Sequence, residues 1–561
     1  MVKRVLTMLN KEISGLHEAA YLLGAFALGS QLLALFRDRL FASTFGASRT
    51  LDLYYAAFRI PDFIFVSIAS MVSVSVLVPF FIKKIKSGEE EGKRFIDNTF
   101  SIFFVAIILV SLVVFICIPY LVPYLFPGLS GDIVQGRLAT LARIMLLSPI
   151  LLGISNFFAS ITQIYNRFFI YALSPLLYNV GIIMGVLVFY PAWGIVGLAW
   201  GVVLGAFLHV VVQVPFIREK KLFPQFRFPF DFSSIRNIVL TSLPRTLTLS
   251  ANQIALFFLV AFASLMGAGS IAVFNFSWNL QSVPLSIVGA SYASAVFPAL
   301  SRYIIEGRHD KFFTDIVMAA RHIIFWSLPL MTLFVVLRAQ IVRTILGAGH
   351  FSWSDTRLTA ACLAIFLLSV VPQSLLLLFI RGYYALGKTY KPLLINVVSA
   401  VCIVVLGYVF IQWYNSSIYF RYFLESLFKV ENVSGSIILV LPLAYTIGTT
   451  INALWHFVAF QYEFKTFSHL IGRTFFASFS ASVIAGYVAH LFLSVFDDVF
   501  NINTFSGIFL QGLCSGVLGI VAGVIILLLL KNQEIKDVWR TLHEKFWKAK
   551  VMGADSVEPA R

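Results

Sequence analysis

The chain has 561 residues, of which 59 % are apolar and only 12 % are charged, and its formal net charge is +16. This composition excludes a single soluble core of this size, which would combine amphipathic stripes with abundant surface charge. Apolar runs of about 20 residues, each long enough to cross about 30 Å of hydrocarbon, recur along the chain and predict an all-α polytopic membrane protein.

The first apolar run begins near Leu16, after Lys3, Arg4 and Lys11, and passes thirty residues without a small-residue cleavage site. It therefore predicts a retained span and not a cleaved signal peptide. Breaks at charges, prolines, glycines and polar turns divide the chain into about fourteen spans. We expect them near 15–44, 53–82, 95–125, 135–164, 168–189, 194–217, 236–266, 270–301, 313–336, 355–380, 389–413, 434–460, 471–495 and 505–530.

Alternate loops carry most of the lysine and arginine residues, within 83–94, 218–236, 302–311 and 381–391. The loops between them have little positive charge, except for two longer ones that contain Arg338 to Arg357 and Arg421 to Lys429. By the positive-inside rule both termini are expected to be cytoplasmic. The positive charge is then explained by loops and a basic tail that face anionic membrane lipids, and nucleic acid is not an expected partner.

The sequence repeats at a spacing of about 220 residues. Phe41–Ala47, FASTFGA, recurs as Phe262–Ala268, FASLMGA; Val78-Pro79 recurs as Phe297-Pro298, and Pro175–Val180 recurs as Pro392–Val397. Six spans per repeat give two lobes of the same orientation, related by an axis along the membrane normal, with the last two spans outside the repeat. We expect an N-terminal lobe at 1–220, a C-terminal lobe at 221–430 whose twelfth span extends to about 460, two further helices at 461–530 and a basic cytoplasmic tail at 531–561.

A cluster of charges near the N-terminus is the first candidate functional site. An ionised side chain at the middle of a bilayer costs about 2.5–3.5 kcal/mol, so a charge at that depth normally faces a partner or a watery cavity. Pro61 lies among these charges and should kink the second span. The charges either form ion pairs that lock two helices or bind an anionic headgroup. They are Arg37, Asp38, Arg39, Asp52, Arg59 and Asp62, whereas the matching stretch 269–284 of the second lobe has none.

Arg245 follows Pro244 in the seventh span, which contains no acidic residue to neutralise it. It adds positive charge to the candidate site, or its side chain snorkels to the cytoplasmic interface. Neither alternative is excluded by the sequence.

Catalytic and metal-binding patterns do not occur. The four cysteines are scattered within apolar segments without CxxC spacing, the histidines are dispersed, and there is no P-loop or Ser/His/Asp arrangement. A membrane-embedded enzyme is therefore disfavoured. We expect no cofactor and no metal site.

The run Phe36-Arg37-Asp38 … Phe45-Gly46-Ala47 … Asp52 … Ala57–Asp62 closely resembles the N-terminal signature of the MurJ/MviN family. The resemblance continues through Asn166-Arg167-Phe168 and Pro175–Asn179 to Phe297–Ser301. It implies a fourteen-helix member of the multidrug/oligosaccharidyl-lipid/polysaccharide (MOP) exporter superfamily. Members of the MurJ/MviN family flip lipid II across the bacterial cytoplasmic membrane, and the resemblance implies the same activity here. It also implies two lobes that alternate access around a cationic cavity, with Arg37, Asp38, Asp52 and Arg59 at charged cavity positions.

This chain departs from the family pattern where the resemblance would place arginines or a glutamate, namely at Gln31, Phe65, Val66, Asn279 and Ser282. A Wzx-like flippase of another polyprenyl-diphosphate-linked oligosaccharide is therefore an alternative, and a MATE-like drug/cation antiporter is a second one. The seventh and eleventh spans contain no Asp or Glu, so a carboxylate-based sodium site is not supported and the coupling ion stays open.

The resulting hypothesis is a monomeric flippase whose partners are a lipid-linked glycan and membrane lipids. We expect Arg37, Arg39 and Arg59, with Arg245 as a further candidate, to hold the diphosphate. Asp38, Asp52 and Asp62 are expected to orient those arginines or to release them between states.

Overall fold

The computed structural model describes residues 16–69, 77, 80–81, 84, 88–165, 167–464 and 467–547. Within these ranges all regular structure is helical, which agrees with the predicted all-α class. The Val78-Pro79 pair of the repeat, Asn166 of the family signature and the end of the basic tail lie outside the described residues.

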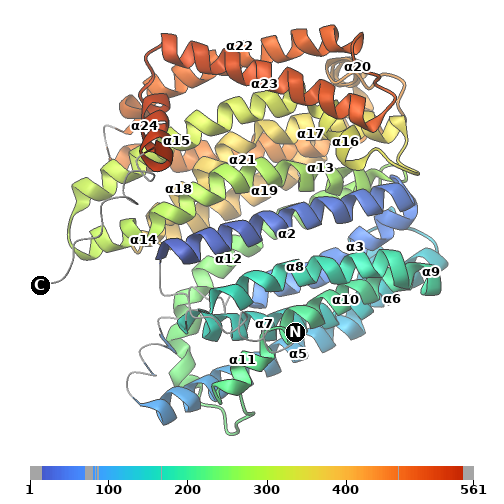
Figure 1. Cartoon of the computed structure of the whole chain (residues 1–561). Coiled ribbons are helices and arrows are strands. Elements are labelled where there is room, and N and C mark those ends of the chain that lie inside the picture. Colours follow the sequence, from blue (N-terminus) through green and yellow to red (C-terminus); the bar gives the residue numbers. More distant parts are fainter. Residues whose placement is uncertain are drawn as a thin grey trace, which may run out of the picture. The chain divides into compact units, whose positions relative to one another are not determined.

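The helices of the first half follow the predicted order (Figure 1). They are α2 (Leu16–Phe45), α3 (Arg49–Ile64) with the π-helix η1 (Phe65–Ala69), α5 (Glu89–Leu125), α6 (Asp132–Met145), α7 (Leu147–Ile164), α8 (Phe168–Met184), η3 (Gly185–Phe189), α9 (Tyr190–Trp193), α10 (Ile195–Val211) and α11 (Val214–Glu219).

The second half continues in the same way. It consists of α12 (Phe232–Ser264), α13 (Ser270–Pro284), η4 (Leu285–Ala290), α14 (Ser291–Ile305), α15 (His309–Val336), α16 (Arg338–Leu346), α17 (Trp353–Leu368), α18 (Val370–Ala385), α19 (Tyr390–Ser416), α20 (Ile418–Leu427), η5 (Ser436–Leu439), α21 (Val440–Glu463), α22 (Phe467–Asp497), α23 (Phe505–Leu529) and α24 (Gln533–Trp547).

Eleven helices of the described residues are long and apolar enough to cross a membrane, and the count rises to twelve if α17 and α18, bent by 42°, form one span. They coincide with the twelve spans predicted from residue 95 onward. The first predicted span coincides with α2. The second coincides with α3 and η1 as far as residue 69, and most of its remainder lies outside the described residues.

By packing, the helices form two compact units. The first comprises the described residues up to Leu280 together with Ile345–Cys362 and Thr389–Gly448. The second comprises Gln281–Thr344, Leu363–Lys388 and the described residues from Thr449 onward. The division into lobes at 1–220 and 221–430, which follows from the repeat and not from packing, stays a prediction.

Each unit has its own phenylalanine-rich interior. In the first unit, Phe81 packs edge to face against Phe95 and Phe157. In the second unit, Phe460 packs against Phe379 and Tyr383. Edge-to-face aromatic pairs are favourable beyond the area that they bury, so the many phenylalanines of the sequence give these cores specific packing.

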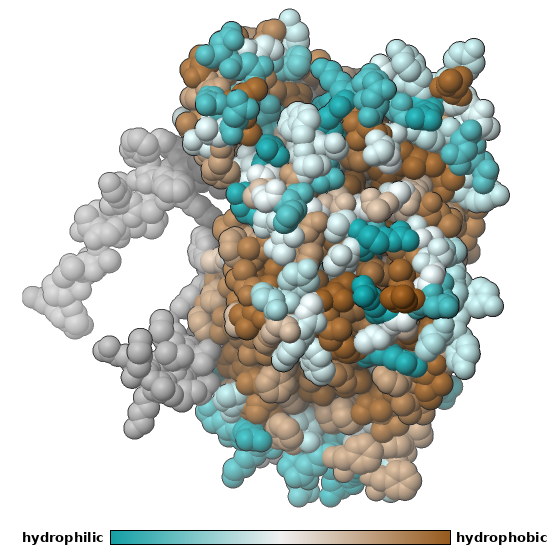
Figure 2. Space-filling view, turned by 90° about the vertical axis from the view of Figure 1, so that its right-hand side faces the viewer, coloured by the Kyte–Doolittle hydropathy of each residue, from teal (hydrophilic) through white to brown (hydrophobic). Residues whose placement is uncertain are grey.

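Apolar side chains also lie on the molecular surface, as expected for helices solvated by lipid. On α5, Leu109, Leu112, Val113 and Ile116 are each more than half exposed. Figure 2 shows hydrophobic areas that continue between the hydrophilic side chains of the face in view.

Three π-helices, η1, η3 and η4, occur in the described residues, and two of them, η1 and η4, start at Phe65 and Leu285, which are about 220 residues apart. A π-helical segment is rare and marks a local insertion in an α-helix. The η1 and η4 segments have the spacing of the sequence repeat, whereas η3 has no π-helical counterpart in α19, and the repeat stays a prediction.

The last two predicted spans, α22 and α23, pack against each other in the second unit (Figure 1). After them, α24 occupies the start of the predicted basic tail. Its residue Glu534 is nearly fully buried and accepts a hydrogen bond from Arg321 Nε at 2.6 Å and another from Thr474 Oγ1 at 2.7 Å. The beginning of the tail is thus fixed to α15 by an ion pair and to α22 by a hydrogen bond.

Glycines allow α8 and α10 to touch backbone to backbone in the first unit. A Cβ atom added at Gly181 would lie 2.2 Å from Gly205 Cα, and one added at Gly205 would lie 2.4 Å from the Tyr178 carbonyl oxygen. Small residues permit this close approach in membrane helices. The contact holds α8, and with it Tyr178, in a fixed position.

The change Gly205→Ala should therefore lower thermal stability, because the new methyl group forces α8 and α10 apart at a cost of about 1–3 kcal/mol. Gly136→Ala in α6 is the matched control, since a Cβ atom there meets no heavy atom within 4 Å. Melting temperatures of the purified variants in detergent measure the difference. Equal melting temperatures of the two variants would contradict the close contact.

Candidate functional site

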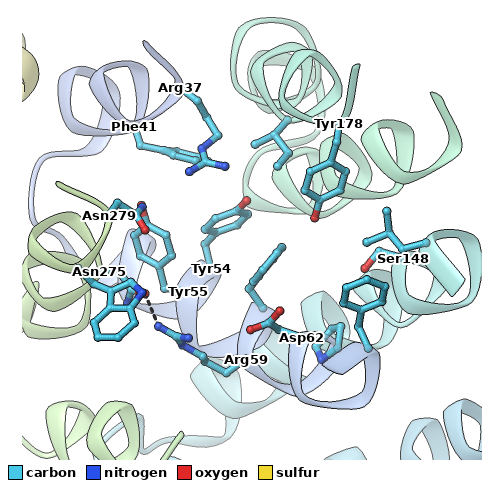
Figure 3. A pocket seen from close by; sticks show the side chains of 16 residues that line it. Arg37, Phe41, Tyr54, Tyr55, Arg59, Asp62, Ser148, Tyr178, Asn275 and Asn279 are labelled. Carbon is cyan, nitrogen blue, oxygen red and sulfur yellow. Dashed lines mark hydrogen bonds between the residues drawn. The ribbon is translucent and has the colours of Figure 1, made fainter. Parts of the chain in front are cut away.

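A cavity of about 370 Å³ lies within the first unit, beside the predicted charge cluster (Figure 3). Five long helices and η1 supply its walls. The lining residues are Arg37 and Phe41 of α2, Tyr54, Tyr55, Phe58, Arg59, Pro61 and Asp62 of α3, Phe65 of η1, Ser148 and Leu152 of α7, Tyr178 and Ile182 of α8, and Asn275, Trp278 and Asn279 of α13.

The register of α3 explains why its polar side chains share this cavity. Tyr55, Arg59 and Asp62 follow one another at spacings of four and three residues, which places them on one face of a helix. Pro61 has no amide hydrogen, and shortly after it the helix changes to η1, where the Phe65 N–H donates to the carbonyl oxygens of Pro61 and Asp62. Proline is a known cause of such a local change.

Arg37 is held in place by two acceptors. Its Nε and Nη2 atoms donate to Asp38 Oδ1 at 3.1 and 2.9 Å, and its Nη1 atom donates to Asn179 Oδ1 at 3.1 Å. Asp38 is buried, and its second oxygen accepts a hydrogen bond from Asn279 Nδ2 at 2.9 Å. The Asp38 carboxylate thus orients the guanidinium group and neutralises its charge.

Arg59 has a different partner. Its Nη2 atom donates to Asn275 Oδ1 at 2.7 Å, as the dashed line in Figure 3 shows. Among the described residues, its other N–H groups make no hydrogen bond. A guanidinium group has five N–H donors in a rigid fork, so Arg59 keeps most of its capacity to bind an anion.

Asp62 is the acidic residue that lines the cavity. Its Oδ2 atom is 3.5 Å from Gln253 Nε2, which is a weak hydrogen bond at best. No ion pair within 4 Å joins Asp62 to Arg59 or to any other described residue, although the two residues are only three positions apart.

Tyr55 contributes a hydroxyl group that is buried and has no hydrogen-bond partner among the described residues. A buried donor without a partner costs about 1–3 kcal/mol, so such groups call for an explanation. Tyr55 thus brings to the cavity lining, beside two arginines, a hydrogen-bond donor that no described residue accepts.

Four residues of the sequence prediction lie outside the cavity lining, namely Asp38, which acts through Arg37, and Asp52, Arg39 and Arg245. Asp52 is buried and accepts hydrogen bonds from the backbone N–H groups of Gly269 at 2.7 Å and Ala272 at 2.9 Å, so it caps the N-terminus of α13. Arg39 Nη1 donates to the Ile345 carbonyl oxygen at 3.2 Å. Arg245 lies on α12, and the lining of the cavity does not include it.

Several polar residues of the site were not predicted as such, among them Tyr55, Tyr178, Asn179 and Asn275. Tyr55 lies within the charge cluster itself but carries no charge, and the other three belong to spans far along the chain from that cluster. Asn279 and Phe65, where the family resemblance would place arginines, both line the cavity. At these two positions the cavity lining therefore lacks a positive charge that the family resemblance would place there.

The cavity has no metal-binding geometry. Within the described ranges, no group of three or more His, Cys, Asp or Glu side chains is placed to hold a metal ion. Two arginines, three tyrosines and two asparagines instead offer hydrogen-bond donors, which suit an anionic, oxygen-rich ligand such as a phosphate group.

Comparisons with known proteins agree with this picture. The family model described as “Lipid II flippase MurJ” matches residues 41–510. A protein of Buchnera aphidicola subsp. Schizaphis graminum (strain Sg), named “Probable lipid II flippase MurJ”, is 27 % identical over 382 residues, which are 67 % of this chain and 74 % of that protein.

Two solved structures have a similar fold. “Lipid II flippase MurJ, inward closed conformation” matches 92 % of this chain and 99 % of its own, with a TM-score of 0.70 and 21 % identity. An inward-facing multidrug resistance MATE family transporter of the MOP superfamily matches 78 % of this chain and 95 % of its own, with a TM-score of 0.61 and 16 % identity.

The predicted fold class and family resemblance are thus confirmed, and the match covers most of the chain. This chain belongs to the MurJ family of lipid II flippases, whose members are transporters and not enzymes.

Proposed function

We propose that this protein moves lipid II across the bacterial cytoplasmic membrane and that the cavity beside Arg37 and Arg59 binds the diphosphate of the lipid. The observation that carries this proposal concerns Arg59, which lines the cavity and, among the described residues, uses only its Nη2 atom in a hydrogen bond. Membership of the MurJ family supplies the identity of the substrate class.

The two arginines have complementary roles in this proposal. Arg37 is pre-oriented by Asp38 and Asn179, so it loses little freedom when it binds a phosphate oxygen. Arg59 offers a fork of N–H groups that can hold a phosphate through two hydrogen bonds. In this proposal the Tyr55 hydroxyl, which has no partner among the described residues, donates a further one when the ligand binds.

Alternating access requires that the cavity open to each side of the membrane in turn. We propose that both termini are cytoplasmic, as the distribution of positive charge predicts. The pair α22 and α23 lies outside the predicted repeat, and we assign to it the contact with the lipid tail. We propose that the protein acts as a monomer, with two lobes that move about the headgroup site.

Removal of Arg59 tests the site directly. Arg59→Ala should weaken binding of lipid II by at least about tenfold, because a hydrogen bond to a charged group contributes about 1.5–3 kcal/mol. Membrane insertion should be unimpaired, since a charge at depth opposes insertion. Binding to the purified protein and the amount of protein in membranes measure the two effects.

Arg94→Ala is the control for this variant, because it removes the same charge from an exposed side chain of α5 that pairs with Glu90. It should leave binding unchanged. Full complementation of growth by Arg59→Ala would refute the proposed role of the arginine.

Tyr55→Phe separates ligand binding from stability. The variant should melt no lower than the wild type, since it removes a buried hydroxyl that has no partner among the described residues. Its affinity for lipid II should fall about three- to tenfold, as expected for one lost hydrogen bond.

Tyr414→Phe is the matched control, because the Tyr414 hydroxyl donates to Glu425 at 2.7 Å and lies 2.8 Å from Ser436 Oγ, away from the cavity. This control should lower the melting temperature and leave lipid II binding unchanged. A drop in stability for Tyr55→Phe, with unchanged binding, would show that the Tyr55 hydroxyl serves the fold.

Depletion in the native host tests the transported substrate. We expect lipid II to accumulate in the inner leaflet, followed by lysis, when the protein is depleted. Labelled lipid II and its accessibility at the outer surface provide the measurement. Loss of a surface polymer with intact peptidoglycan would instead identify a flippase of another polyprenyl-diphosphate-linked glycan.

A further inference from the structure

Asp62 is anomalous in a site that binds an anion. Its carboxyl group lines the cavity, yet the one hydrogen-bond contact that it makes with the described residues is Gln253 Nε2 at 3.5 Å. In Figure 3 the Asp62 side chain points toward the interior of the cavity, while the Arg59 guanidinium group is turned to Asn275. The neighbouring arginine therefore does not neutralise Asp62 by direct contact.

The other charged and titratable groups around the cavity are accounted for. From α2, Arg37 is paired with Asp38. Three tyrosines also line the cavity, Tyr54 and Tyr55 of α3 and Tyr178 of α8. On α10, His209 Nδ1 lies 2.6 Å from Ser155 Oγ. The described parts of α6, α7, α12 and α13 contribute no charged side chain to the lining.

An ionised Asp62 would oppose the bound diphosphate. Both are negative, they share one small cavity, and the low local dielectric strengthens their repulsion. A protonated carboxyl group has the opposite effect, because it carries no charge and donates a hydrogen bond to a phosphate oxygen. The two forms of Asp62 thus differ in their affinity for the same headgroup.

We propose that Asp62 is a proton-binding site that couples proton uptake to binding of the lipid diphosphate. The inference rests on the proposed function and assigns to that site a coupled ion. Membrane transporters use buried carboxyl groups in this way because a proton changes their charge without a change in their shape.

The proton balance of this step is simple. One proton from the water on the side to which the cavity is open forms an O–H bond with the Asp62 carboxylate as the headgroup enters. The proton returns to water on the other side when the headgroup leaves and Asp62 ionises again. One proton accompanies each headgroup. The net negative charge that crosses the membrane is therefore one unit smaller than the charge of the headgroup alone.

Binding of purified lipid II to the purified protein between pH 5.5 and 8.5, roughly the range in which a perturbed carboxyl group titrates, tests the inference. In the wild type the dissociation constant should rise with pH, by up to about tenfold per unit, as linkage to one proton requires. The ligand does not mask this effect, because its diphosphate is esterified at both ends and lacks the ionisation near about pH 6 of a phosphate monoester.

Asp62→Asn should bind with an affinity that is independent of pH and equal to that of the wild type at low pH. Asp62→Glu should keep the pH dependence, since it restores a carboxyl group. Asp38→Asn is the matched control: it removes a carboxylate that is already paired with Arg37, so it should bind more weakly but keep the slope. In a weakly buffered solution, lipid II should cause uptake of about one proton per molecule bound by the wild type and of none by Asp62→Asn.

The outcomes distinguish this inference from the proposed function. If the wild type binds lipid II with the same pH dependence as Asp62→Asn, or takes up no proton, the proton site is refuted and the flippase function stands. If the slope disappears in Asp38→Asn and persists in Asp62→Asn, the wrong carboxyl group has been assigned and the inference fails. If the wild type binds no lipid II at any pH, both proposals are overturned.

Discussion

The buried Asp38 carboxylate is the interaction on which the arrangement of the site depends. One of its oxygens accepts two hydrogen bonds from Arg37 of α2, and the other accepts one from Asn279 of α13. Arg37 extends the connection to Asn179 of α8. Because a charge at membrane depth is stable only with partners, this one group fixes the positions of three helices around the cavity.

α13 is held at two levels by acidic residues of the N-terminal charge cluster. Asp52 caps its first turn through the backbone N–H groups of Gly269 and Ala272, and Asp38 binds Asn279 more than two turns later. The contact with Asp52 favours a negative partner, since the N-terminus of a helix carries partial positive charge, whereas Asp38 accepts a hydrogen bond from the Asn279 side chain. The charges that the sequence places in one cluster therefore divide between two tasks, support of α13 and formation of the cavity.

Hydropathy predicted the membrane helices well, because the thickness of the bilayer sets the length of each apolar run. The sequence pattern predicted only some of the residues that line the cavity. Arg39 looks equivalent to Arg37 in the sequence, but two residues along an α-helix turn a side chain by about 200°, and Arg39 faces the Ile345 carbonyl oxygen instead. Asn179 and Asn275 come from spans far along the chain. Only the packing of those spans brings them to the arginines.

The reduced number of arginines and the lone carboxyl group follow from one constraint. Arg37 and Arg59 carry two positive charges, and Asp38 and Asp62 carry two negative ones when ionised, so the empty cavity is close to neutral. Neutrality lowers the electrostatic cost of an empty cavity at membrane depth. A neutral cavity, however, attracts a diphosphate only if its internal pairing or its protonation changes on binding. Among the described residues Asp38 is fixed by three hydrogen bonds and Asp62 by one weak contact, which is why the proposed change is assigned to Asp62.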